Sequence, residues 1–220
     1  MKNWKIYSQE SPSLELSDRT AHYIVEKMGS CLVKFFGFTK RKRKKRTRLV
    51  KNALATLGDE EKDGKPHYKV YANGLSRHLR PKDGGQFKKR EWLYDLHWYE
   101  EDETDDYLPT SLPLVVECEW EAKRKDDNIV LFNGIKYDFQ KLLVANADLR
   151  LMVFRIRKRD KENDLAELNK YFDKAIKSYG NLAKGSKFLF VAFDEGEKQI
   201  RYANKYKGQK NTNRNHANAE

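Results

Sequence analysis

The sequence is poor in cysteine and proline and lacks long hydrophobic runs. Its 220 residues include 2 Cys and 5 Pro, and Cys31 and Cys118 have neither a CxxC spacing nor a neighbouring pair of histidines. These features argue against a disulfide framework and a cysteine-based zinc site. No stretch of about 18 consecutive apolar residues occurs, and residues 1–30 lack the apolar centre of a secretion signal. We therefore expect a cytoplasmic protein without a membrane-spanning helix.

Acidic residues are outnumbered by basic ones. The chain has 45 Lys and Arg against 33 Asp and Glu, which gives a net charge of +12. Such an excess points to a polyanionic partner, either nucleic acid or an anionic membrane surface. Aromatic residues make up 12% of the chain, which is more than a disordered polymer carries, so the sequence is expected to fold.

Residues 1–88 are predicted to form an N-terminal region of helices and a basic loop, either separate from the rest or part of the same domain. Residues 17–29 and 49–58 have helical periodicity, and each segment ends at a glycine. Between them, segment 40–48 is charged at every position except Thr47. Like charges at this density repel one another unless an anion is bound.

We predict that this basic segment contacts the phosphates of nucleic acid. A solvated loop or a localisation signal is the alternative. The predicted contact residues are Lys40, Arg41, Lys42, Arg43, Lys44, Lys45, Arg46 and Arg48.

Residues 89–202 show alternating strand and helix patterns. Short apolar runs predict strands at 92–99, 112–120, 149–156 and 187–193, and amphipathic segments predict helices at 135–147 and 163–180. This order predicts an α/β (α+β) fold, a mixed β-sheet flanked by helices on both faces, with at least one parallel crossover. The polar residues 203–220 are predicted to be a disordered tail.

Three acidic residues interrupt apolar strands. Glu117 and Glu119 lie in the run LPLVVECEW, where a strand covered on both faces is normally continuous in aliphatic residues. They share a strand face with Val115 and are separated by about 6.6 Å along the backbone. Asp95 lies in the preceding apolar run. The competing interpretations are an edge strand with a solvated face for the two glutamates, and a turn or a surface Arg partner for Asp95.

We expect the three carboxylates to converge on one edge of the sheet. Hard oxygen ligands of this kind suit Mg²⁺ (or Mn²⁺) better than a soft metal. His97, in the same run as Asp95, is expected to be a packed residue rather than a base or a ligand.

The pattern resembles the PD-(D/E)XK nuclease superfamily, whose restriction-endonuclease-like core is a mixed sheet flanked by helices. The resemblance covers about residues 90 to 195 and rests on Asp95, the Glu117-Cys118-Glu119 triplet and the helix and strand that follow. The segments YDLHW, ECEW and DFQKLL are similar to those of an uncharacterised bacterial branch with an ExE variant.

The resemblance implies that Asp95 and Glu117 are metal ligands. Glu119 stands where the family usually has Lys, and no Pro precedes Asp95. Lys141, on the following helix, or Lys123, just past the strand, would then replace the family lysine that holds the attacking water.

These observations lead to a predicted Mg²⁺-dependent nuclease that hydrolyses phosphodiester bonds of nucleic acid, with DNA preferred to RNA. Asp95, Glu117 and Glu119 are the predicted catalytic and metal-binding residues, and Lys141 is a further catalytic residue. The alternative is a catalytically inactive nucleic-acid-binding module on a nuclease-like fold. A third interpretation is a structural or regulatory protein whose basic loop binds an acidic protein. No membrane partner is expected, and homodimerisation is left open.

Overall fold

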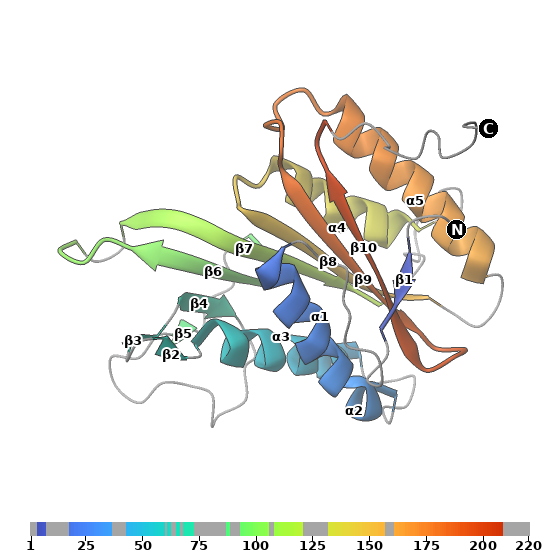
Figure 1. Ribbon diagram of the computed structural model, residues 1–220, viewed down its shortest axis with the longest axis horizontal. Helices are drawn as coiled ribbons and strands as arrows, with labels where there is room; N and C mark the ends of the chain where they lie inside the picture. Colours follow the sequence, from blue (N-terminus) through green and yellow to red (C-terminus); the bar gives the residue numbers. More distant parts are fainter. Residues whose placement is uncertain are drawn as a thin grey trace, which may run out of the picture.

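An eight-stranded mixed β-sheet forms the centre of the described part of the chain (Figure 1). The structure is a computed structural model that describes residues 4–7, 18–36, 43–59, 61–62, 65–66, 68–72, 87–88, 93–105, 108–120, 132–156 and 161–208. The strands of the main sheet follow the order β1-β10-β9-β8-β7-β6-β4-β5, and β2 pairs separately with β3.

The strands are β1 (Lys5–Ile6), β2 (Glu61–Lys62), β3 (Lys65–Pro66), β4 (Lys69–Ala72), β5 (Phe87–Lys88), β6 (Leu96–Glu101), β7 (Pro109–Glu119), β8 (Leu149–Ile156), β9 (Lys187–Asp194) and β10 (Gln199–Tyr206). The helices are α1 (Arg19–Ser30), α2 (Leu32–Phe36), α3 (Arg43–Asp59), α4 (Asn133–Val144) and α5 (Lys161–Ser178).

The parallel centre of the sheet consists of β7, β8 and β9. Helix α4 connects β7 to β8, and α5 connects β8 to β9, so the described chain contains two parallel crossovers. Strands β6 and β10 pair antiparallel on either side of this centre. The mixed sheet flanked by helices is therefore confirmed.

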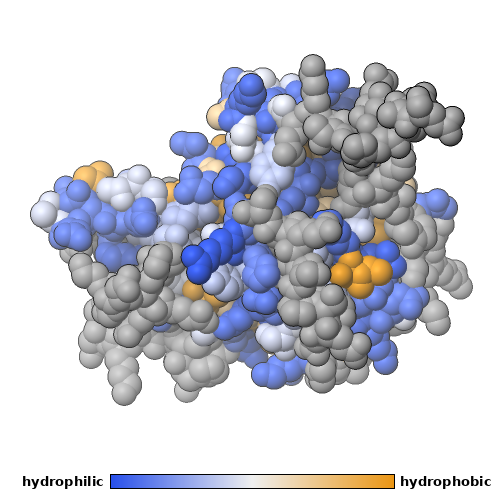
Figure 2. Space-filling model, viewed as in Figure 1, coloured by the Kyte–Doolittle hydropathy of each residue, from blue (hydrophilic) through white to orange (hydrophobic). Residues whose placement is uncertain are grey.

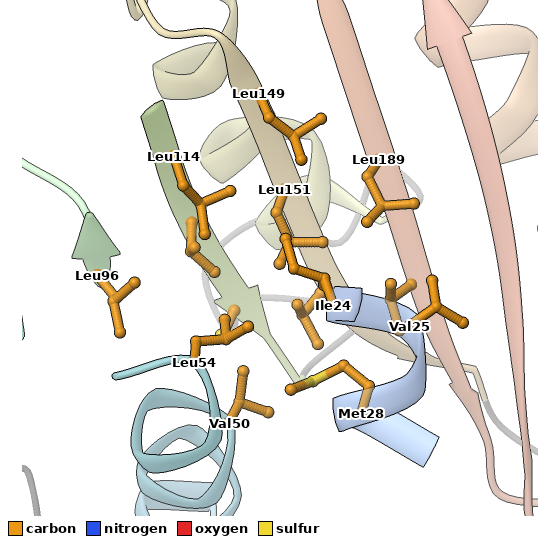
Figure 3. Packing of buried hydrophobic residues seen from close by; sticks show 14 of the residues in the cluster. Ile24, Val25, Met28, Val50, Leu54, Leu96, Leu114, Leu149, Leu151 and Leu189 are labelled. Atoms are coloured by element: carbon orange, nitrogen blue, oxygen red, sulfur yellow. The ribbon is translucent and has the colours of Figure 1, made fainter. Parts of the chain in front are cut away.

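Helices cover both faces of the sheet, which explains the near-continuous apolar sequence of the central strands. On one face, Phe139 of α4 and Phe172 of α5 pack against Phe190 of β9, at ring-centroid distances between 4.2 and 5.6 Å. On the other face, α1 and α3 cover the sheet, and leucines from three neighbouring strands face them (Figure 3). Those leucines are Leu114, Leu151 and Leu189. The described helices of residues 1–88 thus share one buried cluster with the strands of residues 89–202.

Several element boundaries differ from the sequence-based expectation. Helix α3 begins at Arg43, inside the basic segment, because Arg and Lys are good helix formers. Strand β6 begins only at Leu96, because residues 93–95 form a bend, so Asp95 precedes the strand. Strand β10 was not predicted, and it extends through 203–206, which the sequence analysis assigned to the tail. The remaining tail positions, 209–220, lie outside the described residues.

Strand β10 exists because the chain reverses directly after β9. Lys198 adopts a left-handed conformation with φ of 53° in the turn between the two strands. Ile200, Tyr202 and Ala203 are buried in the resulting antiparallel pair.

The face shown in Figure 2 is largely hydrophilic, with apolar residues in small separate groups. None of the described helices is long and apolar enough to cross a membrane.

Candidate active site

Strand β7 carries its two glutamates into the interior. It is paired on both sides, with β6 and with β8, and α4 packs across it. Glu117 is 2% exposed and Glu119 is 1% exposed. The interpretation of an edge strand with a solvated face is therefore wrong, because both neighbouring strands and α4 exclude water from these side chains. Burying a carboxylate is costly unless it is paired, protonated or bound to a cation.

Asp95 lies beside these glutamates, directly before β6. The first residue of β6, Leu96, pairs with Val116 of β7. The Oδ2 atom of Asp95 accepts a hydrogen bond from the backbone N–H of Cys118 at 2.8 Å, and its Oδ1 atom lies 3.1 Å from Nζ of Lys51. The charged partner shown for Asp95 is therefore a buried lysine of α3 rather than a surface Arg, and Asp95 itself lies in the bend that precedes β6.

Lys141 reaches the site from α4. Its Nζ atom lies 3.2 Å from Oε2 of Glu117 and 3.0 Å from Oδ1 of Asp138. Burial lowers the pKa of Lys141, but the two carboxylates more than offset that effect, so its pKa is raised. Lys141 is therefore a charged ammonium held between two acids, rather than a freely solvated residue of the outer helix face.

Glu117 is the least satisfied acid of the group. Its Oε1 atom is buried and has no hydrogen-bond partner among the described residues. Burial, together with the negative charges of Asp95 and Asp138 and against the opposing effect of Lys141, raises the pKa of Glu117 to about 8. At neutral pH, without an added cation, the carboxyl group is therefore largely protonated.

Two other residues of interest are packed around this group. Glu119 lies two positions beyond Glu117 on the same face of β7. His97 is 1% exposed and stacks on Tyr71 with ring centroids 4.9 Å apart. Burial lowers the pKa of His97 to about 4, so this side chain is neutral at physiological pH. The expectation of a packed histidine is confirmed.

The basic segment is only partly described. Lys40, Arg41 and Lys42 lie outside the described residues, as does Lys123, and only the backbone of Arg43 is described. Lys44, Lys45 and Arg48 are exposed on the first turns of α3. Arg46 instead points inward, because it precedes the buried Val50 by one helical turn, and it forms an ion pair with Glu195 at 3.3 Å.

Lys51 and Asp138 were not predicted as site residues, although the sequence carries a sign of each. Each is a charged residue on the apolar stripe of its helix: Lys51 lies three residues before Leu54, and Asp138 lies three residues after Ile135. A charge at such a position is rarely buried without a partner. Here the two partners are Asp95 and Lys141.

The acids of the site suit a hard divalent cation by donor type, because carboxylate oxygens are the ligands that such ions prefer. The buried Oε1 atom of Glu117 offers an oxygen without a competing hydrogen bond. Asp95 and Glu117 would hold the ion, with Glu119 on the same strand face. In the conformation described, no group of three or more His, Cys, Asp or Glu side chains among the described residues is already arranged to hold a metal ion.

No family model matches the chain, and the searches among curated proteins and solved structures gave no match either.

Proposed function

We propose that the protein is a metal-dependent nuclease of the PD-(D/E)XK type that hydrolyses phosphodiester bonds of nucleic acid, with DNA as the preferred substrate and Mg²⁺ (or Mn²⁺) as the cofactor. The observation that carries this proposal is the buried, unpartnered Oε1 atom of Glu117, flanked by Asp95 and Lys141. A purely structural role leaves that arrangement unexplained, because a buried oxygen atom without a hydrogen-bond partner destabilises the fold.

The residues around Glu117 have distinct tasks in this proposal. Asp95 and Glu117 hold the cation, and Lys51 together with the Cys118 amide fixes the orientation of Asp95. When bound, the cation lowers the pKa of a water molecule and neutralises negative charge on the phosphate. Lys141 uses two of its ammonium donors on Glu117 and Asp138, which leaves a third for the attacking water or a phosphate oxygen.

Substrate contacts would come from the exposed basic residues of α3. Lys44 and Arg48 are one helical turn apart, so they project from the same side of α3. Phosphate contacts of this kind hold the strand without reading its sequence. The net charge of +12 supports association with a polyanion over the whole surface.

Cleavage of supercoiled plasmid in Mg²⁺, in Mn²⁺ and in EDTA tests the proposal. Asp95→Asn and Glu117→Gln should each remove cleavage while DNA binding in EDTA is largely retained. Glu167→Gln is the control, because it also replaces one carboxyl group by an amide, at an ion pair with Lys136 between α4 and α5. Retained cleavage in both site variants would contradict the metal-site assignment.

A catalytically inactive nucleic-acid-binding module is the second candidate. The observation that favours it is the engagement of both Asp95 oxygens, one by Lys51 and one by the Cys118 amide. In this case a gel-shift assay shows binding that weakens with salt. On duplex DNA the logarithm of the binding constant falls by about 0.9 per phosphate contact for each tenfold rise in salt concentration. No cleavage occurs with either metal ion.

A further inference from the structure

Two arginines share one carboxylate at the end of the sheet where the candidate active site lies. Nη1 of Arg155 lies 2.8 Å from Oε1 of Glu195, and Nη2 of Arg46 lies 3.3 Å from the same oxygen. Arg155 is near the end of β8, Glu195 directly follows β9, and Arg46 is on the second turn of α3. Three segments distant in sequence therefore bring these charges together.

The surrounding structure holds both guanidinium groups in place. Nε of Arg155 donates to the carbonyl oxygen of Trp120 at 2.9 Å, and the Trp120 indole N–H donates to Thr47 at 2.7 Å. The guanidinium of Arg46 lies over the Phe35 ring at 5.2 Å. Ordered arginines lose little conformational entropy when they bind an anion, so this arrangement is prepared for one.

A single carboxylate satisfies this pair incompletely. Two positive charges face one negative charge, so the cluster has a net charge of +1. Arg46 is 3% exposed, and its Nε atom has no hydrogen-bond partner among the described residues. Burial and the neighbouring Arg155 lower the pKa of Arg46. The Glu195 side chain is 25% exposed, so the carboxylate that the two arginines share borders on solvent.

We propose that Arg46 and Arg155 form a binding subsite for a phosphate group of a nucleic-acid strand, and that Glu195 occupies this subsite until the phosphate displaces it. A phosphate has more acceptor oxygens and more negative charge than a carboxylate, and arginine binds it through paired N–H donors. The inference rests on the proposed function only in taking the phosphate to belong to a substrate strand.

The subsite lies at the same end of the sheet as Glu117 but on the opposite face, the one that α3 covers. Glu117 pairs with Met152 of β8, and Arg155 is three residues further along the same strand. At ~3.3 Å per residue, that separation is about 10 Å. A DNA strand that contacts both would therefore pass around the end of the sheet rather than along one face.

The variant Glu195→Gln tests the subsite, because it removes the competing charge and keeps the shape of the side chain. Glu167→Gln changes the net charge of the protein by the same amount and is the matched control. Two measurements are made in EDTA, where metal-dependent cleavage is absent: the affinity for a short fluorescein-labelled DNA strand, and the thermal unfolding temperature with inorganic phosphate against chloride at equal ionic strength.

We expect Glu195→Gln to bind the DNA strand about tenfold more tightly than the wild type, since one charge-assisted hydrogen bond accounts for a factor of that order. Inorganic phosphate should raise its unfolding temperature more than that of Glu167→Gln. Adding Arg155→Gln to the Glu195→Gln variant should remove both gains. For each variant the rise in unfolding temperature is measured between chloride and phosphate, and only these rises are compared between variants. A difference in basal stability therefore does not obscure the result.

Three results would overturn the proposal. Equal gains in affinity for the two glutamine variants would show an effect of overall charge. Unchanged DNA affinity of Glu195→Gln, with a response to inorganic phosphate alone, would exclude a strand as the ligand. Gains that persist after Arg155→Gln would place the anion elsewhere. A protein that fails to cleave DNA but shows the expected gains retains the subsite and loses only the proposed hydrolysis.

Discussion

Replacement of Glu117 by Gln should make the protein more stable at neutral pH. In the folded state the pKa of Glu117 is raised from 4.5 to about 8, first by burial and then by Asp95. Between these two values the folded state binds a proton that the unfolded state has released. The free energy of unfolding therefore falls by ~1.4 kcal/mol per pH unit over this window.

The size of the effect follows from the same shift. A pH of 7 lies about 2.5 units above the ordinary pKa of Glu117 and still below its pKa in the folded state. The raised pKa therefore destabilises the folded state at pH 7 by about 3 kcal/mol. Gln is neutral at every pH and nearly isosteric, and it removes this contribution. The opposing effect of Lys141 is already contained in the pKa of about 8, so we expect a gain of up to about 3 kcal/mol.

Urea denaturation in EDTA measures the gain at several pH values. The stability difference between Glu117→Gln and the wild type should increase as the pH rises from 4.5 towards 8 and then level off. Glu167→Gln, which alters an exposed ion pair, should differ from the wild type by less than about 1 kcal/mol and without this pH dependence. A Glu117→Gln variant that is less stable than the wild type throughout this range would refute the reasoning.

Three further outcomes are expected. Mg²⁺ or Mn²⁺ should raise the unfolding temperature of the wild type and leave Asp95→Asn and Glu117→Gln unchanged, as measured by differential scanning fluorimetry; an equal shift in all three would place the ion elsewhere. Lys51→Met should cost about 3 kcal/mol in urea denaturation, because it leaves the partly buried Asp95 without its ammonium partner. Gly58→Ala should destabilise the protein by about 1–3 kcal/mol despite the higher helix propensity of alanine, because the new Cβ atom would lie 2.5 Å from Nε1 of the buried Trp98. A neutral or stabilising result there would contradict the packing described.

The central strands were predictable because their environment is visible in the local sequence. Strand β8 has the predicted bounds, 149–156, and β7 and β9 include the predicted runs almost completely. A strand covered by helices on both faces must be apolar at nearly every position. The same reasoning made Glu117 conspicuous, and its burial agrees with it.

Strand β10 and the start of β6 were harder to predict. Strand β10 contains Arg201, Asn204 and Lys205, and its sequence alone resembles a polar tail. Its pairing with β9 supplies the backbone hydrogen bonds and buries Ile200 and Tyr202. Asp95 follows apolar residues like those of a strand. The bend at 93–95 nevertheless delays the start of β6, so its pairing with β7 begins at the next residue, Leu96. Pairing partners, rather than local composition, decide such positions.

The sequence by itself determined the alternation of strands and helices, the basic excess and the three conspicuous acids, because periodicity and charge are local properties of the chain. Only the tertiary structure decided which charges meet. Lys51 and Lys141 approach Asp95, before β6, and Glu117, in β7, from helices on opposite faces of the sheet. Arg46 and Arg155, more than a hundred residues apart in the chain, meet at Glu195. Ion pairs of this kind depend on how helices pack on the sheet, and packing is set by the whole buried surface rather than by any one segment.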